Sequence, residues 1–302
     1  MENSSQNKND KKSLILFVSA MLIFGTVGIF RRFIPVSSAL LACFRGLSGA
    51  LFLVIPAFIQ KKKLRNNIGK KNFLILIVTG ILIGLNWLLL FEAYNYTTVA
   101  TATLCYYMEP TIVVLLSPLV LKEKLTVKKS LCALAAIVGM GFVSGVIEGG
   151  GMSFTDFKGV LFGLGAAVLY SAVVLTNKKV PGIDAYEKTT IQLFSASIIL
   201  VPYLLIFEDF TAIKLNALAI IMMIIVGLLH TGIAYAMYFG SMDGLQAQSI
   251  AIFSYLDPIF AVILSAVLLR EPMTLFGIIG AVLIIGAAMI SEVTFKRKSV
   301  SV

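Results

Sequence analysis

The stretch CYYMEPTIVVLLSPLVLKEKLT, residues 105–126, places one carboxylate, Glu109, inside an otherwise apolar run and follows it directly with Pro110. A proline inside a helix removes a backbone hydrogen bond and kinks the chain. A charge within a membrane span costs about 2.5–3.5 kcal/mol on insertion scales, so it normally faces protein or water. The stretch therefore predicts a kinked membrane helix whose acid faces the inside of a helix bundle.

The second half of the chain repeats this pattern. The stretch SYLDPIFAVILSAVLLREPMT, residues 254–274, has Asp257 and Pro258 where the first stretch has Glu109 and Pro110. The same register brings several further positions together, pairing Tyr107 with Tyr255, Trp87 with Tyr235, Gly84 with Gly232 and Glu123 with Glu271. We therefore expect one five-helix unit to be used twice.

The composition indicates a membrane protein. Of the 302 residues, 59% are hydrophobic and 13% charged, whereas soluble domains carry about 25% charged residues. Apolar runs close to membrane-spanning length recur along the chain. They predict an all-α polytopic fold with ten transmembrane helices, roughly at 13–30, 36–59, 72–94, 97–120, 126–147, 158–177, 188–207, 215–239, 245–268 and 274–293.

The repeat also predicts the domain organisation. Residues 1–12 are expected to be a disordered cytoplasmic leader, 13–147 the first repeat, 158–293 the second and 294–302 a cytoplasmic tail. Because five is odd, the second repeat enters the membrane from the opposite side. Inverted repeats of this kind are typical of secondary transporters, whose substrate site lies near the midplane between the halves.

The net charge is +10, and the distribution of the basic residues predicts how the protein is oriented in the membrane. Most lysines and arginines fall in the loops on one side, which the positive-inside rule assigns to the cytoplasm together with both termini. We therefore expect a multi-pass protein of the cell membrane, with the lipid bilayer as its partner. The basic surplus does not indicate nucleic-acid binding.

The sequence lacks the common motifs for catalysis, nucleotide binding and metal binding. Three cysteines at unrelated spacings predict neither disulfides nor a zinc site, and they are better explained as packing residues. The chain contains no Walker A loop, no zinc motif and no nucleophile elbow, and it has one histidine. We expect no enzyme activity, no cofactor and no bound metal.

The two repeated stretches resemble the two copies of the EamA domain, which defines a branch of the drug/metabolite transporter superfamily. The acid-proline pair, followed by a leucine-basic-glutamate element, occurs in both halves. The resemblance implies a ten-helix transporter, commonly an exporter of amino acids, other metabolites or drugs. It also implies a central cavity lined by helices 1–4 and 6–9, with helices 5 and 10 at the periphery.

The two acids leave three roles open. Glu109 and Asp257 are candidates for coupling transport to a proton, for binding a cationic substrate group, or for fixing the shape of the kinks. Because the resemblance implies that this pair recurs in relatives with different cargo, a structural role or a role in conformational coupling is favoured over substrate contact.

Three further polar residues are candidates for the substrate pathway. Arg45 lies in the middle of a predicted helix, where it needs an acidic partner such as Glu92 or Glu109, or binds a substrate carboxylate. Glu92 has no acidic counterpart in the second repeat. His230 is either a proton relay or, as favoured here, a neutral hydrogen-bonded residue between helices.

Aromatic residues are the last signal. Gly80, Gly84 and Trp87 share one face of a predicted helix, and the glycines predict close helix contacts. Aromatic side chains suited to an aromatic box for a cation or an apolar group are Trp87, Tyr107, Tyr170, Tyr235 and Tyr255. Packing between helices is the alternative for each of them.

Together these observations predict a secondary active transporter, an exporter of a small amino-acid-like or amine- or drug-like metabolite that works by alternating access. The alternatives are a flippase for a lipid-linked substrate on the same fold and, less favoured, a membrane sensor or intramembrane enzyme. Coupling to protons or to a counter-substrate, and assembly into a homodimer, are compatible with the sequence.

Overall fold

The computed structural model describes residues 2–59, 68–122, 124–144, 153–180, 183, 185–211, 213, 215–242, 245, 250 and 253–292. Every regular element in these ranges is a helix. The elements are α1 (Glu2–Gly25), α2 (Val27–Arg32), α3 (Ser38–Ile59), α4 (Lys70–Tyr96), α5 (Val99–Tyr106), α6 (Glu109–Val120), α7 (Val127–Val143), α8 (Phe154–Asn177), α9 (Ala185–Phe207), α10 (Ala217–Ile225), the π-helix η1 (Val226–Ile233), α11 (Ala234–Met242), α13 (Leu256–Leu268) and α14 (Leu275–Glu292).

Six segments in the described part of the chain are long and apolar enough to cross a membrane. They are Lys11–Arg32, Lys70–Tyr96, Val99–Val120, Phe154–Asn177, Tyr186–Phe207 and Ala217–Ser241. Three shorter apolar helices accompany them, at Ser38–Val54, Leu256–Leu268 and Leu275–Ser291. The all-helical membrane fold expected from composition is therefore confirmed.

The helix of the opening stretch is interrupted rather than merely bent. Helix α5 ends at Tyr106, Tyr107 and Met108 form a turn, and α6 begins at Glu109. Pro110 therefore lies in the first turn of α6, where the missing N–H has no helical partner to lose. In the second half, Pro258 likewise lies in the first turn of α13.

Helix α1 begins at Glu2, within the segment expected to be a leader. The assignment of residues 1–12 as a disordered cytoplasmic leader stays a prediction.

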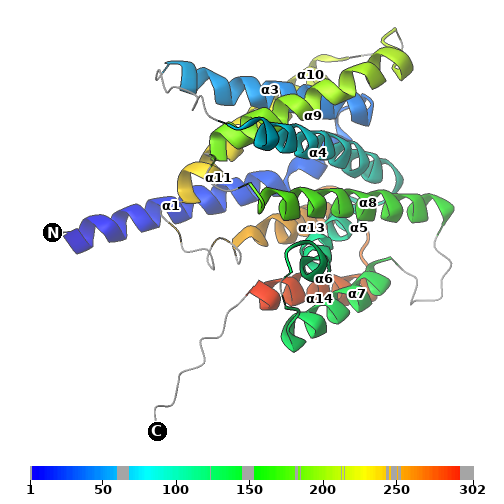
Figure 1. The fold of residues 1–302 in the computed structure, drawn as a ribbon. Helices are drawn as coiled ribbons and strands as arrows, with labels where there is room; N and C mark the ends of the chain where they lie inside the picture. Colours follow the sequence, from blue (N-terminus) through cyan, green and yellow to red (C-terminus); the bar gives the residue numbers. More distant parts are fainter. Residues whose placement is uncertain are drawn as a thin grey trace.

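The helices form a bundle with a peripheral pair. Helix α4 packs against α8 and α9, α3 packs against α9 and η1, and α1 packs against α11 and α13. Helices α7 and α14 pack on each other at one edge of the molecule, away from α3 and α10 (Figure 1). Their backbones approach at Gly139 and Gly280, where a Cβ on Gly139 would lie 2.8 Å from the carbonyl oxygen of Gly280.

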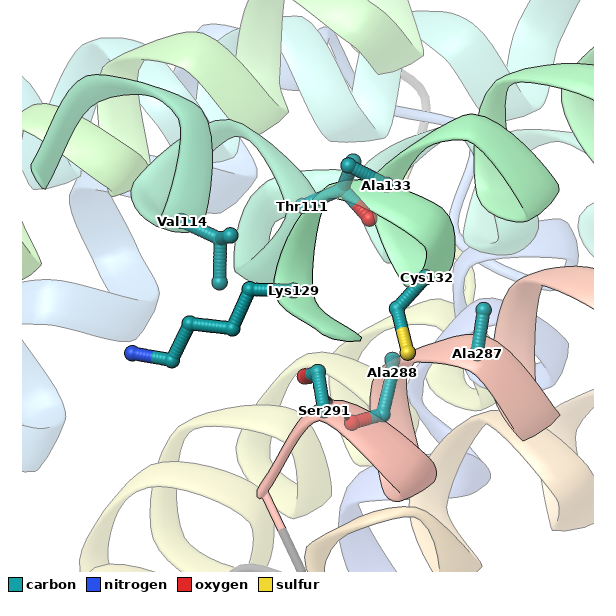
Figure 2. A pocket seen from close by; sticks show the side chains of 8 residues that line it. All are labelled: Thr111, Val114, Lys129, Cys132, Ala133, Ala287, Ala288 and Ser291. Atoms are coloured by element: carbon teal, nitrogen blue, oxygen red, sulfur yellow. Dashed lines mark hydrogen bonds between the residues drawn. The ribbon is translucent and has the colours of Figure 1, made fainter. Parts of the chain in front are cut away.

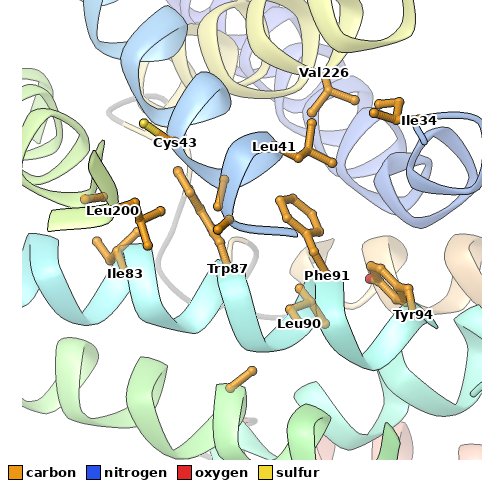
Figure 3. Close-up of a cluster of buried hydrophobic side chains, with 14 of the residues drawn as sticks. Ile34, Leu41, Cys43, Ile83, Trp87, Leu90, Phe91, Tyr94, Leu200 and Val226 are labelled. Atoms are coloured by element: carbon orange, nitrogen blue, oxygen red, sulfur yellow. The ribbon is translucent and has the colours of Figure 1, made fainter. Parts of the chain in front are cut away.

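Glycines also bring α4 against α9, as their spacing predicts. A Cβ on Gly80 would lie 2.5 Å from the carbonyl oxygen of Gln192, and one on Gly84 would lie 2.5 Å from that of Ala196. Further along α4, Trp87 and Phe91 point toward α3 and fill the space beside Leu41 (Figure 3). This packing fixes the face of α4 that carries the candidate site residues.

Candidate functional site

A cavity of about 700 Å³ lies at the centre of the bundle. Its lining comes from α1, α2, α3, α4, α5, α6, α8, α9, α11 and α13 and from the turns beside them. Among the described residues, none of α7 or α14 contributes to it. The peripheral position of these two helices agrees with what the resemblance implied for helices 5 and 10. Of the sequence-predicted site residues, the cavity lining includes Arg45, Trp87, Tyr107, Glu109, Pro110, Tyr170, Tyr235, Tyr255 and Asp257.

The two halves meet in the cavity through a tyrosine and an acid. The Tyr107 hydroxyl donates a hydrogen bond to Oδ2 of Asp257 at 2.5 Å. Tyr107 lies in the turn between α5 and α6, and Asp257 lies in the first turn of α13. The interruption before each proline is therefore what places a polar side chain of one half against that of the other.

Glu109 and Tyr255 are the counterparts of this pair in the sequence repeat, and both line the same cavity. Glu109 is the first residue of α6, where the positive end of the helix dipole favours a negative charge. Its backbone carbonyl accepts a hydrogen bond from the Ser171 hydroxyl of α8 at 3.2 Å. The acid at each interruption thus lies at a helix N-terminus facing the cavity.

Arg45 is held against aromatic rings rather than in the expected contact with Glu92. Its guanidinium carbon lies 4.4 Å from the ring centroid of Trp87 and 5.8 Å from that of Phe91. Its Nε donates to Oγ1 of Thr231 in η1 at 2.8 Å. The side chain is 5% exposed. The cation is therefore desolvated and stabilised by ring faces and a hydroxyl.

Aromatic rings form much of the remaining wall. Tyr106 contacts Tyr107 and Tyr170, with ring centroids 5.6 and 5.9 Å apart. On the other side, Tyr235 contacts Phe24 edge-on at 5.4 Å. Both the packing interpretation and the aromatic-box interpretation fit this geometry, because the rings contact one another and also face the cavity.

Glu92 and His230 lie outside the cavity lining. Oε2 of Glu92 accepts hydrogen bonds from the Ser38 hydroxyl at 2.6 Å and from the Asn95 amide at 3.1 Å. Arg31 donates to the same Ser38 and Asn95. Glu92 is therefore part of a polar cluster that joins α2, α3 and the end of α4.

His230 links η1 to α1. Its Nε2 lies 2.7 Å from Oγ1 of Thr26, and its Nδ1 lies 3.3 Å from the carbonyl oxygen of Ile225. The Thr26 hydroxyl donates to the carbonyl oxygen of Ile23 at 2.7 Å, so its oxygen is left to accept a hydrogen bond from Nε2–H of His230. This geometry fits the favoured interpretation of a hydrogen-bonded histidine between helices.

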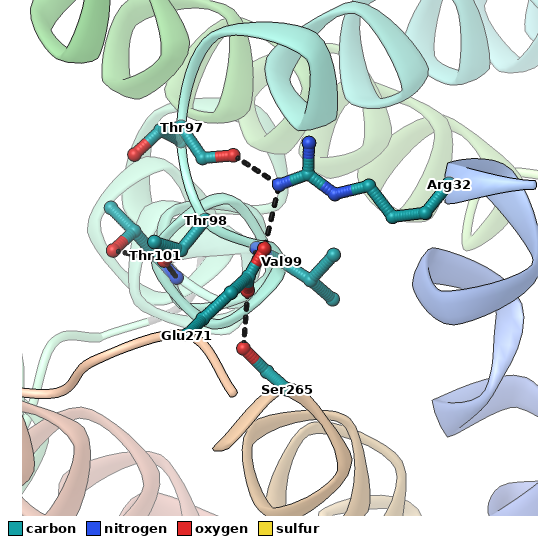
Figure 4. A network of polar contacts seen from close by, with 7 residues as sticks. All are labelled: Arg32, Thr97, Thr98, Val99, Thr101, Ser265 and Glu271. Atoms are coloured by element: carbon teal, nitrogen blue, oxygen red, sulfur yellow. Dashed lines mark hydrogen bonds and ion pairs between the residues drawn. The ribbon is translucent and has the colours of Figure 1, made fainter. Parts of the chain in front are cut away.

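A second polar network, which the sequence analysis missed, joins the end of α2 to the α4–α5 and α13–α14 connections (Figure 4). Nη2 of Arg32 forms an ion pair with Oε1 of Glu271 at 2.7 Å and donates to the carbonyl oxygen of Thr97 at 3.0 Å. Oε2 of Glu271 accepts from the Val99 amide at 2.8 Å and from the Ser265 hydroxyl. The leucine-basic-glutamate element was the signal for Glu271, but its spacing alone gave no partner.

A second, much smaller pocket between α6, α7 and α14 is too small to hold a substrate. Its volume is about 10 Å³, hardly enough for one water molecule. Cys132 points toward Ala288 there, which fits its interpretation as a packing residue (Figure 2).

One known protein family matches this chain twice, once in each half. The EamA-like transporter family matches residues 11–145 and again residues 157–292. The chain belongs to this family. The two matched segments correspond closely to the two expected repeats.

Curated relatives are similar to this chain over nearly its full length. The chain is 28% identical over 298 residues to the uncharacterized transporter YxxF of Bacillus subtilis, covering 98% of this chain and 94% of the relative. It is 25% identical over 293 residues to the uncharacterized transporter YoaV of the same organism, covering 96% and 99%. A solved crystal structure matches with a TM-score of 0.66 over 92% of this chain and 97% of the other, at 19% identity, a likeness that shows the fold alone. The protein is thus a membrane transporter by family.

Proposed function

We propose that this EamA-family protein is a secondary active transporter that exports a small metabolite across the cell membrane by alternating access. The observation that carries the proposal is the central cavity, whose lining is shared by both repeats and whose halves are joined by the Tyr107–Asp257 hydrogen bond. A cavity of about 700 Å³ falls within the usual size of small-molecule sites.

The pattern of helix contacts supports two inverted halves of five helices each. In the sequence repeat, α4 corresponds to α11 and α8 corresponds to α1. The contact of α4 with α8 therefore corresponds to the contact of α11 with α1, and both are present. The contact of α5 and α6 with α8 becomes that of α13 with α1, which is also present. The α7–α14 and α3–α9 contacts map onto themselves. This is the arrangement expected of two halves related by a pseudo-two-fold axis, and an odd number of helices in each half would place that axis in the membrane plane.

The two ends of the cavity differ in a way that suits one state of an alternating-access cycle. Lys178 is exposed and also lines the cavity, so the cavity reaches the surface beside the α8–α9 connection. Beyond the opposite end, the Arg32–Glu271 network ties α2, the α4–α5 connection and the α13–α14 connection together. The positive-inside rule assigns the Lys178 end to the cytoplasm. The structure then corresponds to a state that is open inward and closed outward, from which an exporter loads its substrate.

Transport by the purified protein in liposomes tests this function. Amino acids, amines and nucleobases are screened for uptake and for counterflow, with and without a pH gradient, against protein-free liposomes. We expect at least one class to show saturable flux that competes with unlabelled substrate. A protein that is correctly inserted but moves none of these classes, in either direction and with or without a gradient, would contradict the proposal.

A further inference from the structure

We propose that Arg45 is the anion subsite of the cavity and that the substrate carries a carboxylate attached to an aromatic or bulky apolar body. This inference deepens the proposed function, because it names the substrate class of the same cavity. Its test measures binding alone and requires no transport.

The first argument is the state of the guanidinium. Arg45 is 5% exposed and lines the cavity, and Thr231 accepts its Nε–H. Among the described residues, neither terminal Nη has a hydrogen-bond partner. Two side-chain atoms of the described residues are both fully buried and without a hydrogen-bond partner: Arg31 Nε and Asn86 Oδ1. The Nη atoms of Arg45 are not among them. The Nη atoms of Arg45 are therefore unpaired yet accessible, and the accessible space is the cavity.

The second argument is the orientation of the group. Its carbon lies 4.4 Å from the Trp87 ring centroid, so one face of the guanidinium is covered by the indole. With Nε also occupied, the fork of Nη donors remains for a ligand. That fork matches a carboxylate, which accepts two parallel hydrogen bonds from arginine. The rings of Phe24, Tyr170 and Tyr235 then line the space for the rest of the ligand.

The third argument is the helix that holds Arg45 in place. Thr231 lies in η1, a π-helix (Val226–Ile233), and single π-turns are frequent at functional sites. The threonine is fully buried and its hydroxyl also donates to the carbonyl oxygen of Val226 at 3.3 Å. Thr231 is thus a positioning residue: it fixes Arg45 without facing the ligand.

Trp87 gives the site its own reporter, because it is the one tryptophan in the sequence. Its emission in the purified protein is followed while 3-phenylpropionate or the neutral amide 3-phenylpropionamide is added. The two probes share their apolar body, and neither absorbs at the red edge of the indole band. We expect saturable quenching or enhancement by the carboxylate, and about tenfold or greater weakening for the amide.

Variants separate the subsite from general packing. Arg45→Gln removes the cation and should abolish the preference for the carboxylate, while Arg45→Lys keeps the charge without the fork and should restore only part of it. Thr231→Val should weaken carboxylate binding severalfold, and Thr231→Ser, which keeps the hydroxyl, should restore it. Lys70→Gln removes an exposed cation at the start of α4 and serves as the matched control.

The outcomes are distinct. Equal titration of Trp87 by acid and amide, no saturable response to the acid, or an unchanged preference in Arg45→Gln would each overturn the anion subsite. A Thr231→Val protein that binds like the wild type would also contradict the positioning argument. If carboxylate binding follows the expected pattern but no flux is found in liposomes, the subsite stands and the transport proposal fails.

Discussion

The hydroxyl of Tyr107 donates a 2.5 Å hydrogen bond to Asp257, and the two residues belong to different EamA repeats. Each lies where a membrane helix is interrupted, so the bond links the two points at which the backbone of each half is free to change direction. A rocking motion of one half against the other must either carry this bond along or break it. Substitutions in this pair therefore test the proposed alternating access directly.

Tyr107→Phe should destabilise the present state, because it removes the donor while leaving the part-buried carboxyl group of Asp257 without that partner. We expect a loss of about 1–3 kcal/mol in the free energy of unfolding, measured by thermal or denaturant unfolding in detergent. Tyr203→Phe is the matched control, since Tyr203 lies on α9 with 44% of its surface exposed. Equal stability of the Tyr107→Phe variant and the control would mean that the bond contributes nothing to the fold.

Glu109→Gln and Asp257→Asn test the charge of the two acids at nearly constant volume. If either acid couples transport to protons, its amide should lose uptake driven by a pH gradient while keeping substrate exchange, which needs no net proton movement. If the acids only shape the helix interruptions, both amides should transport normally, and Pro110→Ala and Pro258→Ala should be the harmful changes. The measurement is gradient-driven uptake against counterflow in the same liposomes.

The Arg32–Glu271 pair should act as the outer closure of the cavity. Removing either charge, by Arg32→Gln or Glu271→Gln, should favour opening at that end. A cysteine at Thr103, which lines the cavity and is 4% exposed, should then react faster with an impermeant thiol reagent added to whole cells. The double variant should label no faster than the single ones, since both remove one interaction. Unchanged labelling in both single variants would remove this pair from the gating account.

The proposed inverted repeat and the charge bias together predict the orientation of the loops. A cysteine at Ser153, before α8, should be labelled from outside the cell, and one at Lys70, at the start of α4, should not. The background lacks Cys43, Cys105 and Cys132. Lysed cells provide the control, because both positions are exposed and should then react. The reverse pattern on intact cells would overturn the assigned orientation.

Gly80→Ala and Gly84→Ala should each destabilise the protein by about 1–3 kcal/mol, because the new Cβ would lie 2.5 Å from a backbone oxygen of α9 and the helices would have to separate. Gly286→Ala on α14 is the control. Nothing lies within 4 Å of its added Cβ, so higher helix propensity should leave stability unchanged or raise it by up to about 1 kcal/mol. Thermal unfolding in detergent distinguishes the two behaviours.

The helical membrane fold could be predicted because its cause is local: long apolar runs have few ways to satisfy their backbone in lipid. The sequence predicted a kink beside Pro110, but it gave no sign of the turn at Tyr107 and Met108 that separates α5 from α6. The repeat related the segments of Tyr107 and Asp257 to each other, whereas Arg45 was singled out only because it is a cation inside an apolar run.

The partners of the charged residues could not be predicted in the same way. Arg45 was expected to need an acid, but the fold offers it an indole face and a threonine from a π-helix, and no sequence pattern marks a π-turn. The sequence indicated no partner for Arg32. Its contact with Glu271 joins segments more than two hundred residues apart, |i−j| = 239, a proximity that only the packed bundle creates.

The π-helix η1 sets the helical register of the residues that follow it in α11. A π-turn holds one more residue than an α-turn, so relaxing η1 to a regular α-helix would advance every following residue by one position. One position on an α-helix is about 100° of rotation. Tyr235 and Tyr238 on α11 would then turn away from Phe24, and Thr231 would leave Arg45. A single change of hydrogen-bond register would thus release the cation and dismantle the aromatic wall in the same step.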